Sequence, residues 1–265
     1  MTIVLSALFR YPVKSMAGEF LHRSSVGPLG LPHDRAWMVA DRAGRLVTGR
    51  DFPELVLVRA TPGEDGVTLA APGRPTLVVP NGAFSAAHDA TVWSDCFPAR
   101  HGAQEADDWL SSYLGARVKF LWTGPQTARR VKGHPDVPLS FADGFPLLLI
   151  GEASREDLSR RVGRPLAMAR FRPNLVISGA EPYAEDDWQA LRIGSVTFRL
   201  EKPCERCVFT TVDPETGEKG RDQEPLRTLA GYRKTPAGVI FGRNVIAAGE
   251  GVLEVGMPVE ILAGA

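Results

Sequence analysis

The chain has few cysteines. Its three, Cys96, Cys204 and Cys207, are an odd number in 265 residues, so a disulfide framework of the kind found in small secreted domains is excluded. It also lacks any apolar run of the roughly 18 residues that a membrane helix needs, and its N-terminus has no charged, apolar and small-residue signal regions. We therefore expect a cytoplasmic protein that does not have a membrane as partner.

An excess of charge of either sign is absent as well. Lys+Arg and Asp+Glu both number 31, so the net charge is zero. Without an overall positive field the chain is not expected to bind a nucleic-acid polymer, and any anion site must be a local cluster of cations. What the sequence does have is 27 glycines and 21 prolines, which are typical of many short elements joined by turns.

Short apolar segments separated by turn signals fill the first 98 residues or so, and this spacing predicts a small barrel or sandwich. Three helices are expected: one over 105–114 ended by Gly115, one over 154–162 with Ser154 and Asp157 as a capping box, and one starting at Pro225. Further strands are expected at 46–48, 55–58, 118–122, 147–150, 175–177, 195–200, 208–212, 239–245 and 257–262.

A long polar segment, residues 123–146, has no clear period and carries Arg129, Arg130 and Lys132. Long irregular segments are often functional, but a solvated surface loop fits equally well. If the segment is a lid over the substrate, charge reversal at Arg129 and Arg130 changes affinity for a substrate or donor protein and leaves metal occupancy alone.

The stretch from Lys202 to Asp213 contains Cys204 and Cys207 in a Cys-x-x-Cys pattern. A thiolate binds soft metals or attacks electrophiles, and the neighbouring cations Lys202 and Arg206 favour it. A four-ligand metal site is not supported, because Cys96 is about a hundred residues away and no histidine pair lies nearby. A redox pair and two small buried apolar side chains remain as alternatives. We interpret Cys207 as the reactive or metal-bound sulfur and Cys204 as the less exposed of the two.

Three other clusters place polar side chains at the ends of predicted strands. Lys14 and Ser15 follow the first strand, Arg35 precedes another, and Arg172 and Asn174 precede a third. Arginine offers a planar fork to phosphate, lysine a point charge, and asparagine both a donor and an acceptor to a heterocycle. Solvated cations at strand ends are common, so each cluster alone is a weak signal.

Taken together, four motifs resemble the signature set of MOSC proteins. They are Tyr11-Pro-Val-Lys-Ser15, Asp34-Arg-Ala-Trp37, Phe171-Arg-Pro-Asn174 and Pro203-Cys-Glu-Arg-Cys207 with Thr210-Thr-Val-Asp213. The resemblance implies a mixed α/β but β-dominated fold. A MOSC N-terminal β-barrel-like region, residues 1–122, is then packed on a MOSC β-barrel with a few short helices, residues 123–265.

Within that family the chain resembles the mitochondrial amidoxime-reducing components and their bacterial counterparts, which implies a molybdenum cofactor of the pyranopterin type. The resemblance makes Cys207 the molybdenum ligand and the catalytic residue. It makes Lys14, Ser15, Arg35, Arg172, Asn174 and Arg206 the cofactor-binding residues. The implied reaction is reduction of small N-hydroxylated substrates. Because the chain has no cysteine cluster for a ferredoxin module, we expect electrons from a separate protein of ferredoxin or flavoprotein type.

A second function of a different class stays open at this point. The chain would then carry sulfur as a persulfide on an accessible cysteine, or handle the molybdenum cofactor for other proteins. Such a carrier needs a nucleophilic cysteine but need not hold metal permanently, so metal content separates the two hypotheses. Substrate, donor and the nucleotide form of the pterin are not determined by these motifs.

Overall fold

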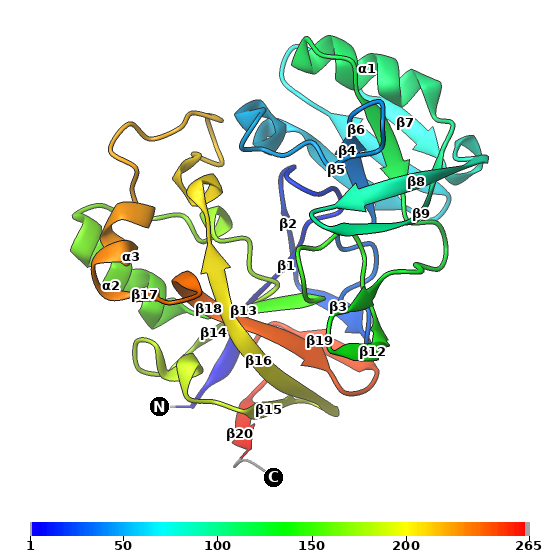
Figure 1. Ribbon diagram of the computed structural model, residues 1–265. Coiled ribbons are helices and arrows are strands. Elements are labelled where there is room, and N and C mark those ends of the chain that lie inside the picture. Colours follow the sequence, from blue (N-terminus) through cyan, green and yellow to red (C-terminus); the bar gives the residue numbers. More distant parts are fainter. Residues whose placement is uncertain (1, 263–265) are drawn as a thin grey trace.

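The computed structural model describes residues 2–262, which form two β-rich lobes (Figure 1). The lower lobe is built on a nine-stranded sheet. Its strands, in spatial order, are β2 (Glu19–Leu21), β1 (Val4–Arg10), β14 (Leu175–Ser178), β13 (Leu147–Gly151), β18 (Gly238–Ala247), β16 (Val196–Arg206), β15 (Ala190–Ile193) and β20 (Val259–Leu262), with β17 (Lys234–Thr235) beside β18.

This sheet curls so that its two ends meet. Val4 in β1 forms an antiparallel bridge with Pro258, and the Val259 N–H next to it donates to the Ile3 carbonyl. Side chains that alternate inward, such as Leu5, Leu149 and Phe198, fill the interior and are fully buried. Closure removes the exposed sheet edges, so the predicted β-barrel is confirmed for this lobe.

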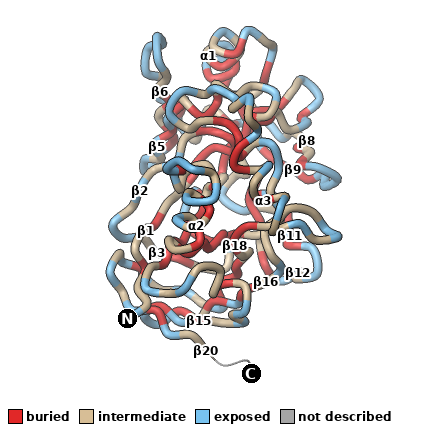
Figure 2. Tube along the Cα trace, turned by 90° about the vertical axis from the view of Figure 1, so that its left-hand side faces the viewer, coloured by how far each residue is buried: buried red, intermediate tan, exposed pale blue. Residues whose placement is uncertain are grey.

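The upper lobe contains two smaller sheets. One has four strands, β4 (Trp37–Ala40), β10 (Lys119–Trp122), β9 (Asp95–His101) and β8 (Ala86–Val92); the other has three, β5 (Arg59–Gly63), β6 (Gly66–Ala70) and β7 (Leu77–Pro80). Two-stranded pairs complete the fold, β3 (Arg23–Val26) with β19 (Gly251–Glu254) and β11 (Arg130–Val131) with β12 (His134–Pro138). Each lobe has buried segments inside and exposed loops outside (Figure 2). The domain boundary expected at residue 122 stays a prediction. Strands β1 and β2 lie before that residue in the sequence but join the sheet of the lower lobe.

The three expected helices are present as α1 (Gln104–Leu114), α2 (Glu152–Val162) and α3 (Leu226–Tyr232). Gly115 and Gly163 end the first two in the left-handed conformation, with φ of 63° and 80°, as glycine after a helix predicts. Within residues 2–262 no helix is long and apolar enough to cross a membrane. The mixed but β-dominated fold class is therefore confirmed.

The predicted capping box of α2 is wrong. Ser154 does not cap the helix; its hydroxyl donates to Glu185 Oε2 at 2.9 Å and accepts from the Tyr183 backbone N–H at 2.8 Å. Glu185 lies in a short 3-10 turn, η4 (Ala184–Asp186), and also accepts from the Gly151 N–H. A carboxylate distant in sequence thus takes the position at the helix N-terminus, where negative charge is favourable.

Two other predictions fail because short apolar runs do not distinguish strands from tight helical turns. Residues 55–58 and 208–212 were expected as strands, yet they lie in the 3-10 helices η1 (Pro53–Leu57) and η5 (Val208–Thr211). Residues 46–48 make only an isolated bridge through Leu46. The remaining 3-10 turns are η2 (Asn81–Ala83) and η3 (Met168–Arg170).

The segment 123–146 is more ordered than the sequence indicates. Besides β11 and β12 it contains Arg129, which is 5% exposed and donates to Asp95 and to the carbonyls of Ser140, Ala142 and Asp143. Arg129 is therefore not a surface charge, so its reversal would disturb the fold and is not a clean test of a lid. Arg130, next to it, is exposed.

Arg129→Glu is expected to destabilise the protein by about 3 kcal/mol or more, because it places a carboxylate against Asp95 and three carbonyl oxygens. Arg130→Glu removes an exposed cation and is expected to change stability by less than about 0.5 kcal/mol. Urea unfolding of the two variants measures the difference. Equal midpoints would show that the buried contacts of Arg129 do not stabilise the fold.

Candidate functional site

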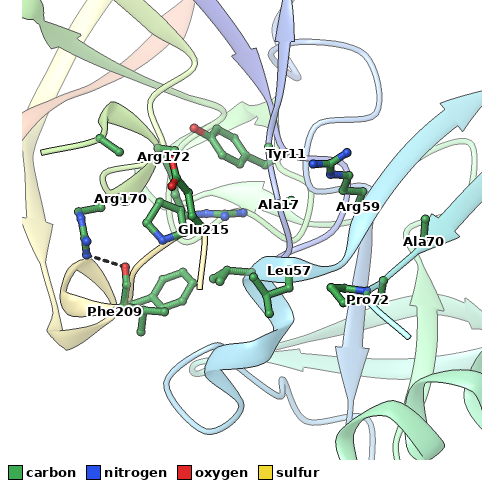
Figure 3. Close-up of a pocket in the computed structure, with 17 residues that line it drawn as sticks. Tyr11, Ala17, Leu57, Arg59, Ala70, Pro72, Arg170, Arg172, Phe209 and Glu215 are labelled. Atoms are coloured by element: carbon green, nitrogen blue, oxygen red, sulfur yellow. Dashed lines mark hydrogen bonds between the residues drawn. The ribbon is translucent and has the colours of Figure 1, made fainter. Parts of the chain in front are cut away.

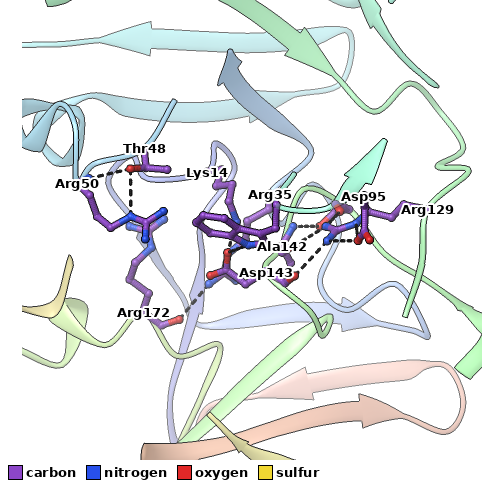
Figure 4. A network of polar contacts seen from close by, with 11 residues as sticks. Lys14, Arg35, Thr48, Arg50, Asp95, Arg129, Ala142, Asp143 and Arg172 are labelled. Carbon is purple, nitrogen blue, oxygen red and sulfur yellow. Dashed lines mark hydrogen bonds and ion pairs between the residues drawn. The ribbon is translucent and has the colours of Figure 1, made fainter. Parts of the chain in front are cut away.

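The predicted site residues come from separate loops that meet between the lobes. Lys14 and Ser15 follow β1, Arg35 immediately precedes β4, and Arg172 lies just before β14. Contacts join them directly: Arg35 Nη2 donates to the Arg172 carbonyl at 3.0 Å, and Arg172 Nη1 donates to the Met16 carbonyl at 2.6 Å. The structure thus brings the clusters of both sequence halves into one network (Figure 4).

Asn174 lies at the centre of this network and is 1% exposed. Its Oδ1 accepts from Arg35 Nη1 at 3.0 Å and from the Leu148 N–H at 3.1 Å. Its Nδ2 donates to the Phe9 carbonyl and to Asp34 Oδ1, both at 3.1 Å. Protein groups therefore use both donors and both lone pairs of the amide. In this arrangement Asn174 fixes the Arg35 fork and does not present its own polar atoms to a ligand.

Tyr11 begins one of the four motifs but was not predicted as a site residue. Arg35 Cζ and Arg172 Cζ lie 4.5 and 4.2 Å from the centroid of its buried ring, within cation–π range. Burial raises the Tyr11 pKa to about 12, so its hydroxyl stays protonated at neutral pH. Burial and then the neighbouring Arg35 lower the pKa of Arg172 to about 10, which leaves the guanidinium charged at neutral pH.

Three of the predicted site residues have left-handed backbones. Ser15, Arg35 and Arg172 have φ of 70°, 50° and 56°. Residues other than glycine in this region store strain, and such residues cluster where a ligand is held. Of the seven residues other than glycine with positive φ in the described part of the chain, three therefore carry predicted site side chains.

Lys14 has partners that only the structure reveals. Its Nζ, on a 9% exposed side chain, lies 2.8 Å from Asp143 Oδ1, and Trp93 Nε1 donates to the same oxygen at 2.8 Å. Arg50 Cζ lies 4.6 Å from the Trp93 ring centroid. Asp143 belongs to the segment 123–146, so one end of that segment does reach the site, through a carboxylate that its basic residues did not indicate.

Lys14 is expected to lose its proton at a lower pH than an ordinary lysine. Burial lowers its pKa below 10.5, Arg35 and Arg129 lower it further, and Asp143 opposes them. Only the ammonium form attracts an anion. As the pH is raised, retention of a phosphorylated ligand should therefore begin to fall before pH 10.5 is reached. Asp143→Asn removes the opposing charge and should move this decline to lower pH, measured as ligand retained after gel filtration. A decline that stays at the same pH in Asp143→Asn would show that Lys14 is not the titrating group.

The two motif cysteines differ as expected: Cys207 is exposed and Cys204 is half-buried. Cys207 directly precedes η5, and its carbonyl accepts from the Thr210 N–H and hydroxyl. Cys204 packs at the edge of the apolar cluster around Phe171 and receives a contact from Arg206 Nη1 at 3.0 Å. In residues 2–262 no three His, Cys, Asp or Glu side chains gather as a metal site.

The residues present fit a phosphorylated pterin bearing molybdenum. Lys14, Arg35, Arg172 and Arg206 supply four cations, and only Asp34 and Asp143 pair with them. Arg172 Nη2 and Arg206 Nε are buried donors without a hydrogen-bond partner among the described residues. A buried donor without a hydrogen bond costs free energy, and the anionic oxygens of a phosphate would accept hydrogen bonds from these two donors. The exposed sulfur of Cys207, next in sequence to Arg206, suits a soft metal.

A cavity of about 570 Å³ adjoins this network where the lobes meet (Figure 3). Tyr11 and Arg172 form part of its wall, together with Phe209 of η5, two residues after Cys207. Residues of the upper lobe, including Leu57 and Arg59, form the opposite wall. The cavity therefore lies next to both the cation cluster and the turn that carries the cysteine.

Comparison with known proteins agrees with this arrangement. A model of the MOSC N-terminal beta barrel domain matches residues 2–117, and a model of the MOSC domain matches residues 136–260. The chain is 33% identical to mitochondrial amidoxime-reducing component 1 of Homo sapiens, over 97% of this chain and 82% of the relative. It is 35% identical to mitochondrial amidoxime reducing component 2 of Bos taurus, over 86% and 72% of the two chains. With both domains present and this likeness over most of its length, the chain belongs to the MOSC family and is related to the amidoxime-reducing components.

Proposed function

We propose that the protein is a molybdenum-cofactor-dependent reductase of small N-hydroxylated compounds. The observation that carries the proposal is the position of Cys207: an exposed thiol that follows the end of β16, two residues before Phe209, whose ring centroid lies 5.7 Å from Cζ of the site cation Arg172. The names of the relatives, amidoxime-reducing components, support the reaction type. The overall change is addition of two electrons and two protons to an N–OH group, which gives N–H and water.

In this proposal different side chains bind different parts of the cofactor. Lys14, Ser15, Arg35 and Arg172 bind its phosphate and pterin edge, Asn174 orients Arg35, and Arg206 supports the turn that carries Cys207. Cys207 is the metal ligand. When bound, the cofactor would supply the two-electron reduction of the N–OH group. Electrons come from a separate protein of ferredoxin or flavoprotein type.

An exposed Cys207 also suits the alternative function, a carrier that presents a persulfide or passes on the cofactor. The cation cluster favours the reductase over a persulfide carrier, because a persulfide carrier has no need for Lys14, Arg35 and Arg172 together in one network. Metal analysis of the gently purified protein separates the two.

The reductase is tested with metal-loaded protein, a low-potential artificial reductant and benzamidoxime. We expect benzamidine to form in proportion to the molybdenum content of the preparation. Arg192→Gln, on the far strand β15 and paired there with Glu260, is a control that should retain both metal and turnover. Molybdenum-loaded protein that reduces no N-hydroxylated compound would leave the carrier as the better explanation.

A further inference from the structure

The cavity between the lobes has walls of unlike character. Leu57 and Pro72 on the upper wall and the Phe209 ring on the lower wall are apolar. The backbone of Gly49 packs against the Phe209 ring on one side, since a Cβ at Gly49 would lie only 2.3 Å from the ring. The space beside the ring therefore suits a flat apolar group, such as an aromatic ring, which gains from stacking and from leaving water.

Charge in the cavity is distributed unevenly. Arg170 is neutralised by its ion pair with Asp213, and Arg172 donates to the Met16 carbonyl without a carboxylate partner. Arg59, exposed at the start of β5, forms no ion pair with any acid in residues 2–262. Figure 3 shows Arg59 and Arg172 on either side of Ala17; because Arg172 is assigned to the cofactor, Arg59 is the guanidinium that remains for a substrate. Glu215 is the single carboxylate among the residues that line it.

From this distribution we infer that the cavity is the substrate site and that it prefers N-hydroxylated aromatic compounds that also carry a carboxylate. The ring lies against Phe209, the carboxylate binds the Arg59 fork, and the N-hydroxylated end points to the η5 side, where Cys207 lies. The inference rests on the proposed reductase function. It adds a specificity-determining residue, Arg59, which belongs to no motif of the cofactor site.

Binding of stable product analogues tests the site without turnover. The probes are 4-carboxybenzamidine and benzamidine, titrated calorimetrically into the purified protein. We expect the carboxylated probe to bind about tenfold more tightly, the size of one charge-assisted hydrogen-bond pair at a partly exposed site. Arg59→Gln should remove this advantage and leave benzamidine affinity unchanged. Arg23→Gln, which removes the same charge from an exposed position on β3, should keep it. Equal affinity of the two probes, or an advantage that survives Arg59→Gln, overturns the inference.

A kinetic arm separates this inference from the reductase function itself. With metal-loaded protein, the ratio of kcat/KM for 4-carboxybenzamidoxime to that for benzamidoxime should fall about tenfold in Arg59→Gln and stay constant in Arg23→Gln. If both compounds are reduced and the ratio does not respond to Arg59→Gln, the substrate preference is refuted while the reductase stands. If neither is reduced although the probes bind as expected, the reductase function fails and the ligand preference of the cavity stands.

Discussion

Cys207→Ser is expected to lose most of its molybdenum and to lower N-hydroxyl reduction at least about 100-fold. Outer-shell substitutions at metal sites commonly cost 10–100-fold, and here the proposed protein ligand itself is changed. A serine hydroxyl is hard and stays protonated at neutral pH, so it replaces a soft thiolate poorly. The fold should persist, since Cys207 is exposed and the two side chains are similar in size. Molybdenum per protein, turnover and the urea midpoint are measured on the same preparation.

Cys204→Ala is the matched control for this experiment. Cys204 packs beside the Phe171 cluster and contacts Arg206, so its loss should affect local packing and leave most of the metal in place. Equal loss of molybdenum in both variants would make the two cysteines joint ligands. A Cys207→Ser protein as active as the wild type would exclude the sulfur from the reaction altogether.

Asn174→Ala is expected to destabilise the fold by about 3 kcal/mol and to weaken cofactor retention. The substitution strips partners from Arg35, Asp34 and two backbone groups in a buried network, and unmade buried hydrogen bonds cost about 1–3 kcal/mol each. Without the amide oxygen the Arg35 fork loses one of its anchors, so retention should fall even at temperatures where the variant is folded. Urea unfolding and the molybdenum content after gel filtration provide the two readouts.

Asn244→Ala provides the comparison, because Asn244 is a half-buried asparagine in β18 that only donates, to the carbonyls of Lys202 and Pro203. We expect it to cost less than about 1 kcal/mol and to leave cofactor retention unchanged. A folded Asn174→Ala protein that keeps its cofactor as well as Asn244→Ala does would contradict the positioning role. Asn174 would then serve stability alone.

The two main helix ends could be predicted from local pattern, whereas the closed barrel was implied by the resemblance to MOSC proteins. Gly115 and Gly163 follow apolar helical periods, and only glycine accepts the left-handed backbone there at no cost. Strand β9 was not predicted because Pro98 lies within it. The structure tolerates Pro98 because β9 pairs along its length with β8 and meets β10 only at Arg100.

The strand predicted from β-propensity is absent where side chains form hydrogen bonds to the neighbouring backbone. Residues 208–212 are strongly β-prone, but Thr210 Oγ1 donates to the Cys207 carbonyl at 3.0 Å and Thr211 Oγ1 to the Val208 carbonyl at 2.8 Å. Such contacts stabilise a tight turn in place of a ladder. The turn exposes Cys207 at the end of β16 and directs Phe209 into the cavity.

The sequence by itself determined which residue types the site holds: a thiol flanked by cations and three strand-end clusters whose order matches one family. The tertiary structure alone decided how they are used. The amide of Asn174 is hydrogen-bonded to four protein partners, and Asp143, held by Trp93, pairs with Lys14. Arg129 is buried, whereas Arg59 lines the cavity and is available to bind a ligand. The reason is distance along the chain. Lys14 and Asp143 are 129 residues apart, and their pairing depends on how two lobes pack, which no local period encodes.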